Sequence, residues 1–96
     1  MADLQVRCIH KPECDIYHEH ITHIGNQLQH WSKTREQAVK EILQGINSFY
    51  TNHPVSGLRA EIRIRQFQNG KPFLQTWVNG EWRNYLLFLP ECPATL

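Results

Sequence analysis

The chain has 96 residues, 41% of them hydrophobic and 20% charged, and a formal net charge of +1. We expect one small globular domain spanning residues 1–96, and the near-zero charge excludes a polybasic tail or a strongly acidic solvating domain. No apolar run reaches about 18 residues, and the first residues lack the pattern of a secretory signal. These features predict a cytoplasmic protein without a membrane partner.

Three cysteines, Cys8, Cys14 and Cys92, cannot all pair within one chain. An odd number of cysteines without a secretory signal is typical of a reducing compartment. We therefore expect free thiols rather than a constitutive disulfide, although a contact between Cys8 and Cys92 across the two ends of the chain stays open.

The N-terminal part of the chain predicts a pair of strands. Residues 3–9 alternate between polar and apolar, which places Leu4, Val6 and Cys8 on one face of a half-buried strand. A polar loop follows, and then a short β-branched run over residues 20–24 ends at Gly25-Asn26. We expect this second strand to pair with the first.

Residues 34–46 predict a helix. Thr34 and Gln37 have the spacing of a capping box, and Gly45 stands where a residue with positive φ would end the helix. Apolar residues recur at the helical period and predict a buried stripe at Ala38, Val39, Ile42, Leu43 and Ile46. The charged residues off this stripe, which we expect to be exposed, are Lys33, Glu36, Lys40 and Glu41.

The C-terminal half predicts a three-stranded meander. Asn69-Gly70 and Asn79-Gly80 both favour two-residue type I′ turns, which divide the region into strands at about 58–68, 71–78 and 81–89. Residues 49–51 are a candidate edge strand. The expected fold class is α+β, with one central helix packed on this antiparallel meander and on the N-terminal strand pair.

Two-residue turns also fix the pairing of strands. The first turn would place Ile62 opposite Trp77, and the second would place Trp77 opposite Trp82. We therefore expect the two tryptophans to face the helix. The full set of side chains expected on that face is Leu58, Ala60, Ile62, Ile64, Phe73, Trp77, Trp82 and Leu86.

The opposite face of the meander is the predicted binding site. Arginine pairs phosphates and carboxylates bidentately, and aromatic rings stack on bases. We therefore expect a small non-enzymatic binding module for nucleic acid or for a protein partner with an acidic surface. The net charge near zero weakens long-range attraction of nucleic acid. The predicted binding residues are Arg59, Arg63, Arg65, Arg83, Tyr85 and Phe67.

An alternative function is a small zinc-stabilised domain, because cysteines and histidines gather in residues 8–23. The candidate ligands are Cys8, His10, Cys14, His18, His20 and His23. No pair has the spacing of a zinc finger, so we expect no metal and no other cofactor. We expect no enzymatic activity either, because the chain has no glycine-rich phosphate loop, and Cys92 has no adjacent group to activate its thiol.

Four segments, in order, resemble a family of short bacterial or phage-borne proteins that extend from an HITHIG-like segment to a terminal LPEC motif. The segments are His20-Ile21-Thr22-His23-Ile24-Gly25, Thr34-Arg35-Glu36-Gln37-Ala38, Ser48-Phe49-Tyr50 and Leu86-Leu87-Phe88-Leu89-Pro90-Glu91-Cys92. The resemblance implies a stand-alone domain of unknown function. It assigns no catalytic or binding role to any residue of this chain.

Overall fold

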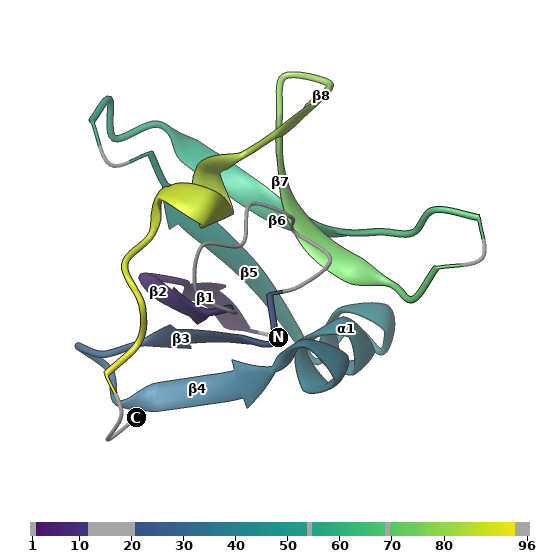
Figure 1. Cartoon of the computed structure of the whole chain (residues 1–96), viewed down its shortest axis with the longest axis horizontal. Coiled ribbons are helices and arrows are strands. Elements are labelled where there is room, and N and C mark those ends of the chain that lie inside the picture. The colour runs from purple at the N-terminus through teal and green to yellow at the C-terminus, as the bar shows by residue number, and fades with distance from the viewer. Residues whose placement is uncertain (1, 12–20, 54, 69, 94–96) are drawn as a thin grey trace.

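The computed structural model describes residues 2–11, 21–53, 55–68 and 70–93 (Figure 1). The elements in chain order are β1 (Ala2–Gln5), β2 (Cys8–His10), β3 (His23–Asn26), β4 (Trp31–Thr34), α1 (Arg35–Leu43), β5 (Asn47–Asn52), β6 (Arg59–Arg65), β7 (Phe73–Val78), β8 (Glu81–Arg83) and the 3-10 helix η2 (Tyr85–Phe88). The α+β class is confirmed. The strands form two sheets rather than a meander with a separate pair, in the orders β1-β5-β6-β7-β8 and β2-β3-β4.

The predicted N-terminal strand is divided between the two sheets. β1 pairs in parallel with β5, whereas β2 pairs antiparallel with β3. Val6 and Arg7 link β1 to β2 and carry the chain from one sheet to the other. The Val6 amide donates to the Tyr50 carbonyl of the first sheet at 2.7 Å, and the Arg7 amide donates to the Gly25 carbonyl of the second at 2.8 Å. The pairing of the two N-terminal segments is thus confirmed for β2 and β3. The strand over residues 47–52 is an inner strand of its sheet and not an edge strand.

Both predicted ends of the helix are confirmed. The Thr34 hydroxyl oxygen accepts the Gln37 amide at 3.1 Å, which caps the first turn. Gly45 adopts φ 69° after the last turn. The Gly45 amide donates to the Ile42 carbonyl and the Ile46 amide to the Glu41 carbonyl, which is the Schellman arrangement.

The buried stripe of α1 is shorter than its periodicity predicts. Ala38 and Val39 are buried, but Leu43 is 74% exposed and Ile46 is 50% exposed. The helix packs against β3 and β4 of one sheet and against β5, β6 and β7 of the other (Figure 1). The expectation that Glu41 is exposed is also wrong, because its side chain is buried in a polar cluster described below.

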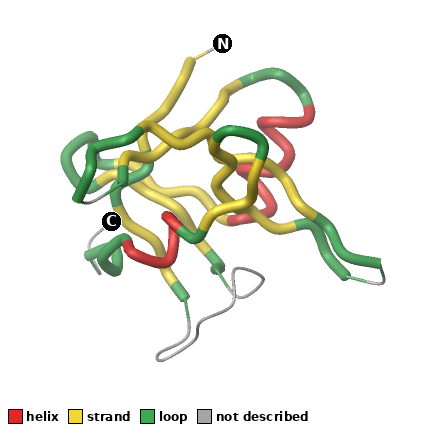
Figure 2. The backbone as a smooth tube through the Cα atoms, turned by 90° about the horizontal axis from the view of Figure 1, so that it is seen from above, coloured by secondary structure: helices red, strands yellow, loops and turns green. Residues whose placement is uncertain are grey.

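The predicted register of the β6–β7 hairpin is wrong by one residue. Ile62 lies opposite Thr76 and Arg65 opposite Phe73, so the described residues between β6 and β7, 66–68 and 70–72, lie outside the ladder and project from the body of the molecule (Figures 1 and 2). Gly70 does not adopt positive φ, and its amide donates to the Phe67 carbonyl at 3.0 Å. A shift of one residue exchanges the faces of a strand. The two tryptophans therefore lie on the side of the sheet away from the core.

The second predicted turn is confirmed. Asn79 and Gly80 have φ values of 52° and 83°, as a type I′ turn requires, and Trp77 lies opposite Trp82. The strand after this turn ends at Arg83, and Leu86 enters the core from η2 instead of from a strand. The core between the two sheets, α1 and η2 consists of Val6, Ile9, Ile21, Ile24, Ala38, Val39, Phe49, Ile62, Leu74 and Leu86.

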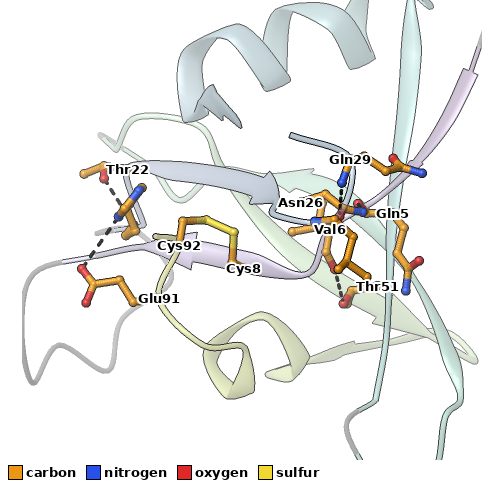
Figure 3. Close-up of a disulfide and its surroundings, with 11 residues drawn as sticks. Gln5, Val6, Cys8, Thr22, Asn26, Gln29, Thr51, Glu91 and Cys92 are labelled. Atoms are coloured by element: carbon orange, nitrogen blue, oxygen red, sulfur yellow. Dashed lines mark hydrogen bonds and ion pairs between the residues drawn. A yellow bond between two sulfur atoms is a disulfide. The ribbon is translucent and has the colours of Figure 1, made fainter. Parts of the chain in front are cut away.

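A disulfide joins Cys8 to Cys92 (Figure 3), which contradicts the expectation of free thiols. The C-terminal segment lies parallel to β2, where the Cys92 amide donates to the Ile9 carbonyl at 3.0 Å. This pairing brings the two cysteine Cα atoms to 4.8 Å, within the usual range for a disulfide. Within the ranges that the structure describes, no helix combines the length and the apolar character needed to traverse a bilayer.

Candidate functional site

The five-stranded sheet has two chemically different faces. Phe49, Ile62 and Leu74 point into the core. Since side chains alternate along a strand and paired residues share a face, the register places a second set on the opposite side. This set, which we call the outer face, consists of Tyr50, Asn52, Arg59, Glu61, Arg63, Arg65, Phe73, Gln75, Trp77 and Trp82, of which Phe73 and Gln75 are buried.

Arginines stack on aromatic rings across the outer face. The guanidinium carbon of Arg59 lies 4.0 Å from the centre of the Tyr50 ring, and that of Arg63 lies 4.9 Å from the Trp77 ring. Trp77 and Trp82 meet edge to face at 4.8 Å between ring centres. Each cation–π contact at an exposed site contributes about 0.5–1 kcal/mol. The contacts hold the rings and guanidinium groups in a fixed arrangement on the surface.

Arg65 occupies the centre of a second group of contacts. Its guanidinium carbon lies 4.9 Å from the Trp82 ring and 4.7 Å from the ring of Phe67, which belongs to the β6–β7 loop. Its Nη1 donates to Oε1 of Gln75 at 3.0 Å. Beneath this group Phe67 packs on Phe73, which is 1% exposed. Contacts with Trp82, Phe67 and Gln75 thus hold the guanidinium group of Arg65 in position.

The charges on the outer face are almost balanced. Arg59 forms an ion pair with Asp3, and Nη2 of Arg63 lies 3.0 Å from a carboxylate oxygen of Glu61. Among the residues placed in the structure, Arg65 has no carboxylate partner. The face therefore offers one uncompensated positive charge, and that charge lies between two aromatic rings.

The structure brings together four of the six predicted binding residues. Arg59, Arg63, Arg65 and Phe67 lie on or beside the outer face. The other two lie elsewhere. Arg83 is opposite Thr76, on the other side of the sheet, where it pairs with Glu81 at 2.6 Å.

Tyr85 is part of η2, where its ring meets the ring of His53 edge to face at 4.7 Å. The predicted cluster missed Tyr50, Trp77 and Trp82, which are the stacking partners of the arginines. The sequence of β7 does not alternate between apolar and polar residues in a way that would assign Trp77 to the outer face. Residues 73–76 are all buried, so burial occurs on both faces of that strand and its apolar pattern does not identify the core side.

The predicted zinc ligands are only partly placed. Cys8 is bonded to Cys92 and has no thiolate to offer, which removes Cys8 from the zinc set and Cys92 from any nucleophilic role. His10 and His23 lie opposite each other in β2 and β3, with ring centres 5.4 Å apart. Cys14, His18 and His20 lie outside the described residues. Across residues 2–11, 21–53, 55–68 and 70–93, no group of three potential ligands gathers.

A buried polar cluster joins α1 to the strands on either side of it. A carboxylate oxygen of Glu41 accepts from Nζ of Lys33 at 2.9 Å, and the other accepts from Nδ2 of Asn47 at 2.6 Å. Burial raises the pKa of Glu41, but the hydrogen bonds from Asn47 and Lys33 and the positive charge of Lys33 together lower the pKa below its ordinary value. The cluster fixes the helix in position relative to β4 and β5.

Together these features define a small α+β protein of two sheets with an arginine–aromatic outer face. The chain belongs to the family described as Protein of unknown function (DUF3892), whose model matches residues 5–90. The matched range contains the whole outer face and Cys8 and ends before Cys92. No curated protein and no solved structure matches the chain.

Proposed function

We propose that this protein is a non-enzymatic binding module whose outer face docks a protein partner that presents a carboxylate to Arg65. The observation that carries the proposal is the environment of Arg65, which lies between two aromatic rings and has no carboxylate partner in the described part of the chain. A guanidinium group has five N–H donors, of which one is engaged with Gln75. Donors therefore remain for a bidentate pair with a carboxylate.

The composition of the face favours a protein over a nucleic acid. Binding energy in protein interfaces concentrates in tryptophan, tyrosine and arginine, which are the residue types gathered here. Nucleic-acid binding requires several cations free to neutralise successive phosphates. Arg59 and Arg63 are already paired with carboxylates, so the outer face offers too little free positive charge for a polyanion.

The proposal is tested by cross-linking from two exposed phenylalanines. Phe67 is 49% exposed beside Arg65, and Phe88 is 56% exposed in η2. A photoreactive phenylalanine analogue is placed at either position in the full chain, which is then irradiated in a lysate of the native cell. We expect a protein adduct from position 67, none of the same mass from position 88, and loss of the adduct in Arg65→Gln.

Nucleic acid is tested in parallel. Single-stranded RNA and duplex DNA are titrated at two salt concentrations, since affinity through phosphate contacts falls steeply with salt. If RNA or DNA binds in a salt-dependent manner and Arg65→Gln abolishes this binding, the partner of the outer face is a nucleic acid and not a protein. An adduct that Arg65→Gln leaves unchanged would show that the outer face is only a solvated surface.

A further inference from the structure

Two histidines from neighbouring strands of the three-stranded sheet lie side by side. His10 of β2 is opposite His23 of β3 in the register, and their ring centres are 5.4 Å apart. Imidazole is a ligand that Zn²⁺, Cu²⁺ and Ni²⁺ favour. Two imidazoles that share one tetrahedral ion, each with a metal–nitrogen bond of about 2.0–2.1 Å, have ring centres about 5 Å apart. The separation of the two rings therefore suits two ligands of a single ion.

The hydrogen bonds of Thr22 determine which ring nitrogen of His23 carries the proton. The Thr22 hydroxyl donates to the His10 carbonyl at 3.2 Å, and its oxygen lies 3.0 Å from Nδ1 of His23. Because the carbonyl takes the one hydroxyl proton, the Thr22 oxygen is the acceptor and Nδ1 of His23 is the donor. The lone pair of the neutral ring is then on Nε2, which is the nitrogen that can bind a metal ion.

His10 also has an oxygen partner at Nδ1. A carboxylate oxygen of Glu91 lies 3.7 Å from this nitrogen, and its negative charge favours a proton there and a lone pair on Nε2. The disulfide and the bridge between Glu91 and Ile9 hold this carboxylate beside β2 (Figure 3). Metal-binding histidines usually have such a partner at their second ring nitrogen, which orients the ring and makes it a better ligand. His10 and His23 are both partly exposed, so an ion in solution can reach them.

We propose that His10 and His23 bind a divalent transition-metal ion of the Zn²⁺ and Cu²⁺ class through their Nε2 atoms, with water completing the coordination. The ion links β2 to β3, and the carboxylate of Glu91 adds a negative charge that favours a cation. The expectation of no metal relied on the spacing of ligands along the sequence. That spacing does not show a pair of histidines formed between two strands.

The test is a metal titration of the isotope-labelled full chain, followed by NMR of the imidazole nitrogens at pH 7.5, since a metal binds the neutral ring. Before metal is added, the proton of His23 should be on Nδ1. We expect Zn²⁺ to shift the Nε2 signals of His10 and His23 with saturation at one equivalent, and Mg²⁺, which prefers oxygen ligands, to leave them unchanged. Calorimetry should show tighter binding of Cu²⁺ than of Zn²⁺. A proton on Nε2 of His23, or no saturable shift up to about 1 mM Zn²⁺, would overturn the proposal.

Matched variants assign the ion to this pair, and the amide spectrum of each metal-free variant checks its fold. His10→Gln and His23→Gln should each weaken Zn²⁺ binding at least tenfold, because one imidazole remains. His30→Asn removes an exposed histidine from the β3–β4 turn, where asparagine tolerates the φ of 58°, and should bind within twofold of wild type. Cys14→Ser should likewise leave binding unchanged. Equal binding by wild type and both glutamine variants, or loss of binding in Cys14→Ser, would contradict the assignment.

Discussion

The two faces of the five-stranded sheet use the same strands for different purposes. On the inner face, Phe49 and Leu74 are at most 1% exposed, and their burial stabilises the fold. On the outer face, the side chains of Arg63 and Glu61 are 47% and 57% exposed and are joined by an ion pair. Exposed ion pairs and cation–π contacts each contribute about 1 kcal/mol or less. The inner face therefore contributes most to stability, whereas the exposed arginines of the outer face contribute little to it.

The largest expected effect comes from truncating the inner face. Phe49→Ala removes a fully buried ring and should lower the free energy of unfolding by about 3–5 kcal/mol, which is a large part of the stability of so small a protein. Trp77→Ala is the control on the outer face, and it should cost about 1–2 kcal/mol because its contacts with Arg63 and Trp82 lie on a half-exposed surface. Urea unfolding followed by circular dichroism measures both. Equal losses would show that the two faces are wrongly assigned.

Reduction of the disulfide is the next largest effect. Cys8 and Cys92 are separated by 84 positions, and a closed loop of that length stabilises a fold by about 2–5 kcal/mol. Both sulfurs belong to buried residues, so the loss acts on the core and not on the outer face. Thermal unfolding of wild type with and without reductant measures the effect, and Cys92→Ser should melt at the temperature of the reduced protein. A melting temperature unchanged by reductant would contradict the structure.

A smaller effect is expected at acid pH. The pKa of Glu41 is lower in the folded chain than its ordinary value, so the ionised group stabilises the fold above the unfolded-state pKa of about 4.3. This stabilisation is lost as pH falls through the lowered pKa, when protonation weakens the pair with Lys33. Urea unfolding measures the free energy of unfolding at pH 3 and at pH 6. The difference between the two values should be smaller for Glu41→Gln than for wild type. An identical difference in the two proteins would mean that Glu41 is not ionised in a buried cluster.

The smallest effect on stability belongs to the arginines of the outer face. Arg63→Gln and Arg65→Gln each remove contacts on an exposed or half-buried surface and should change the free energy of unfolding by no more than about 1 kcal/mol. The same urea experiment checks this expectation. A loss as large as that of Phe49→Ala would mean that the outer face is part of the structural core.

Local signals in the sequence were sufficient for α1 and for the second turn. The cap at Thr34, the positive φ at Gly45 and the turn at Asn79-Gly80 each depend on a few neighbouring residues. The arginines of β6 were also placed correctly, because Ile62 and Ile64 alternate with them along one strand. Such features need no knowledge of distant parts of the chain.

The features that the sequence did not predict depend on contacts between residues far apart in the chain. Asn69-Gly70 has the composition of a tight turn, but Phe67 packs on Phe73 and the β6–β7 ladder already ends at the pair Arg65–Phe73. That one-residue shift moved Trp77 to the outer face and separated Arg83 from the other arginines. The disulfide likewise depends on a parallel pairing between the two ends of the chain, which no local pattern indicates.

The most direct test of the division between the two faces is the affinity of the cross-linked partner for two arginine variants. Arg65→Gln and Arg83→Gln remove the same charge from the outer face and from the opposite side of the sheet. Loss of one member of an interfacial charge pair costs about 2–5 kcal/mol, so calorimetric titration should show at least a tenfold weaker Kd for Arg65→Gln. Arg83→Gln should bind within twofold of wild type. Equal affinities of the two variants would contradict a binding function of the outer face.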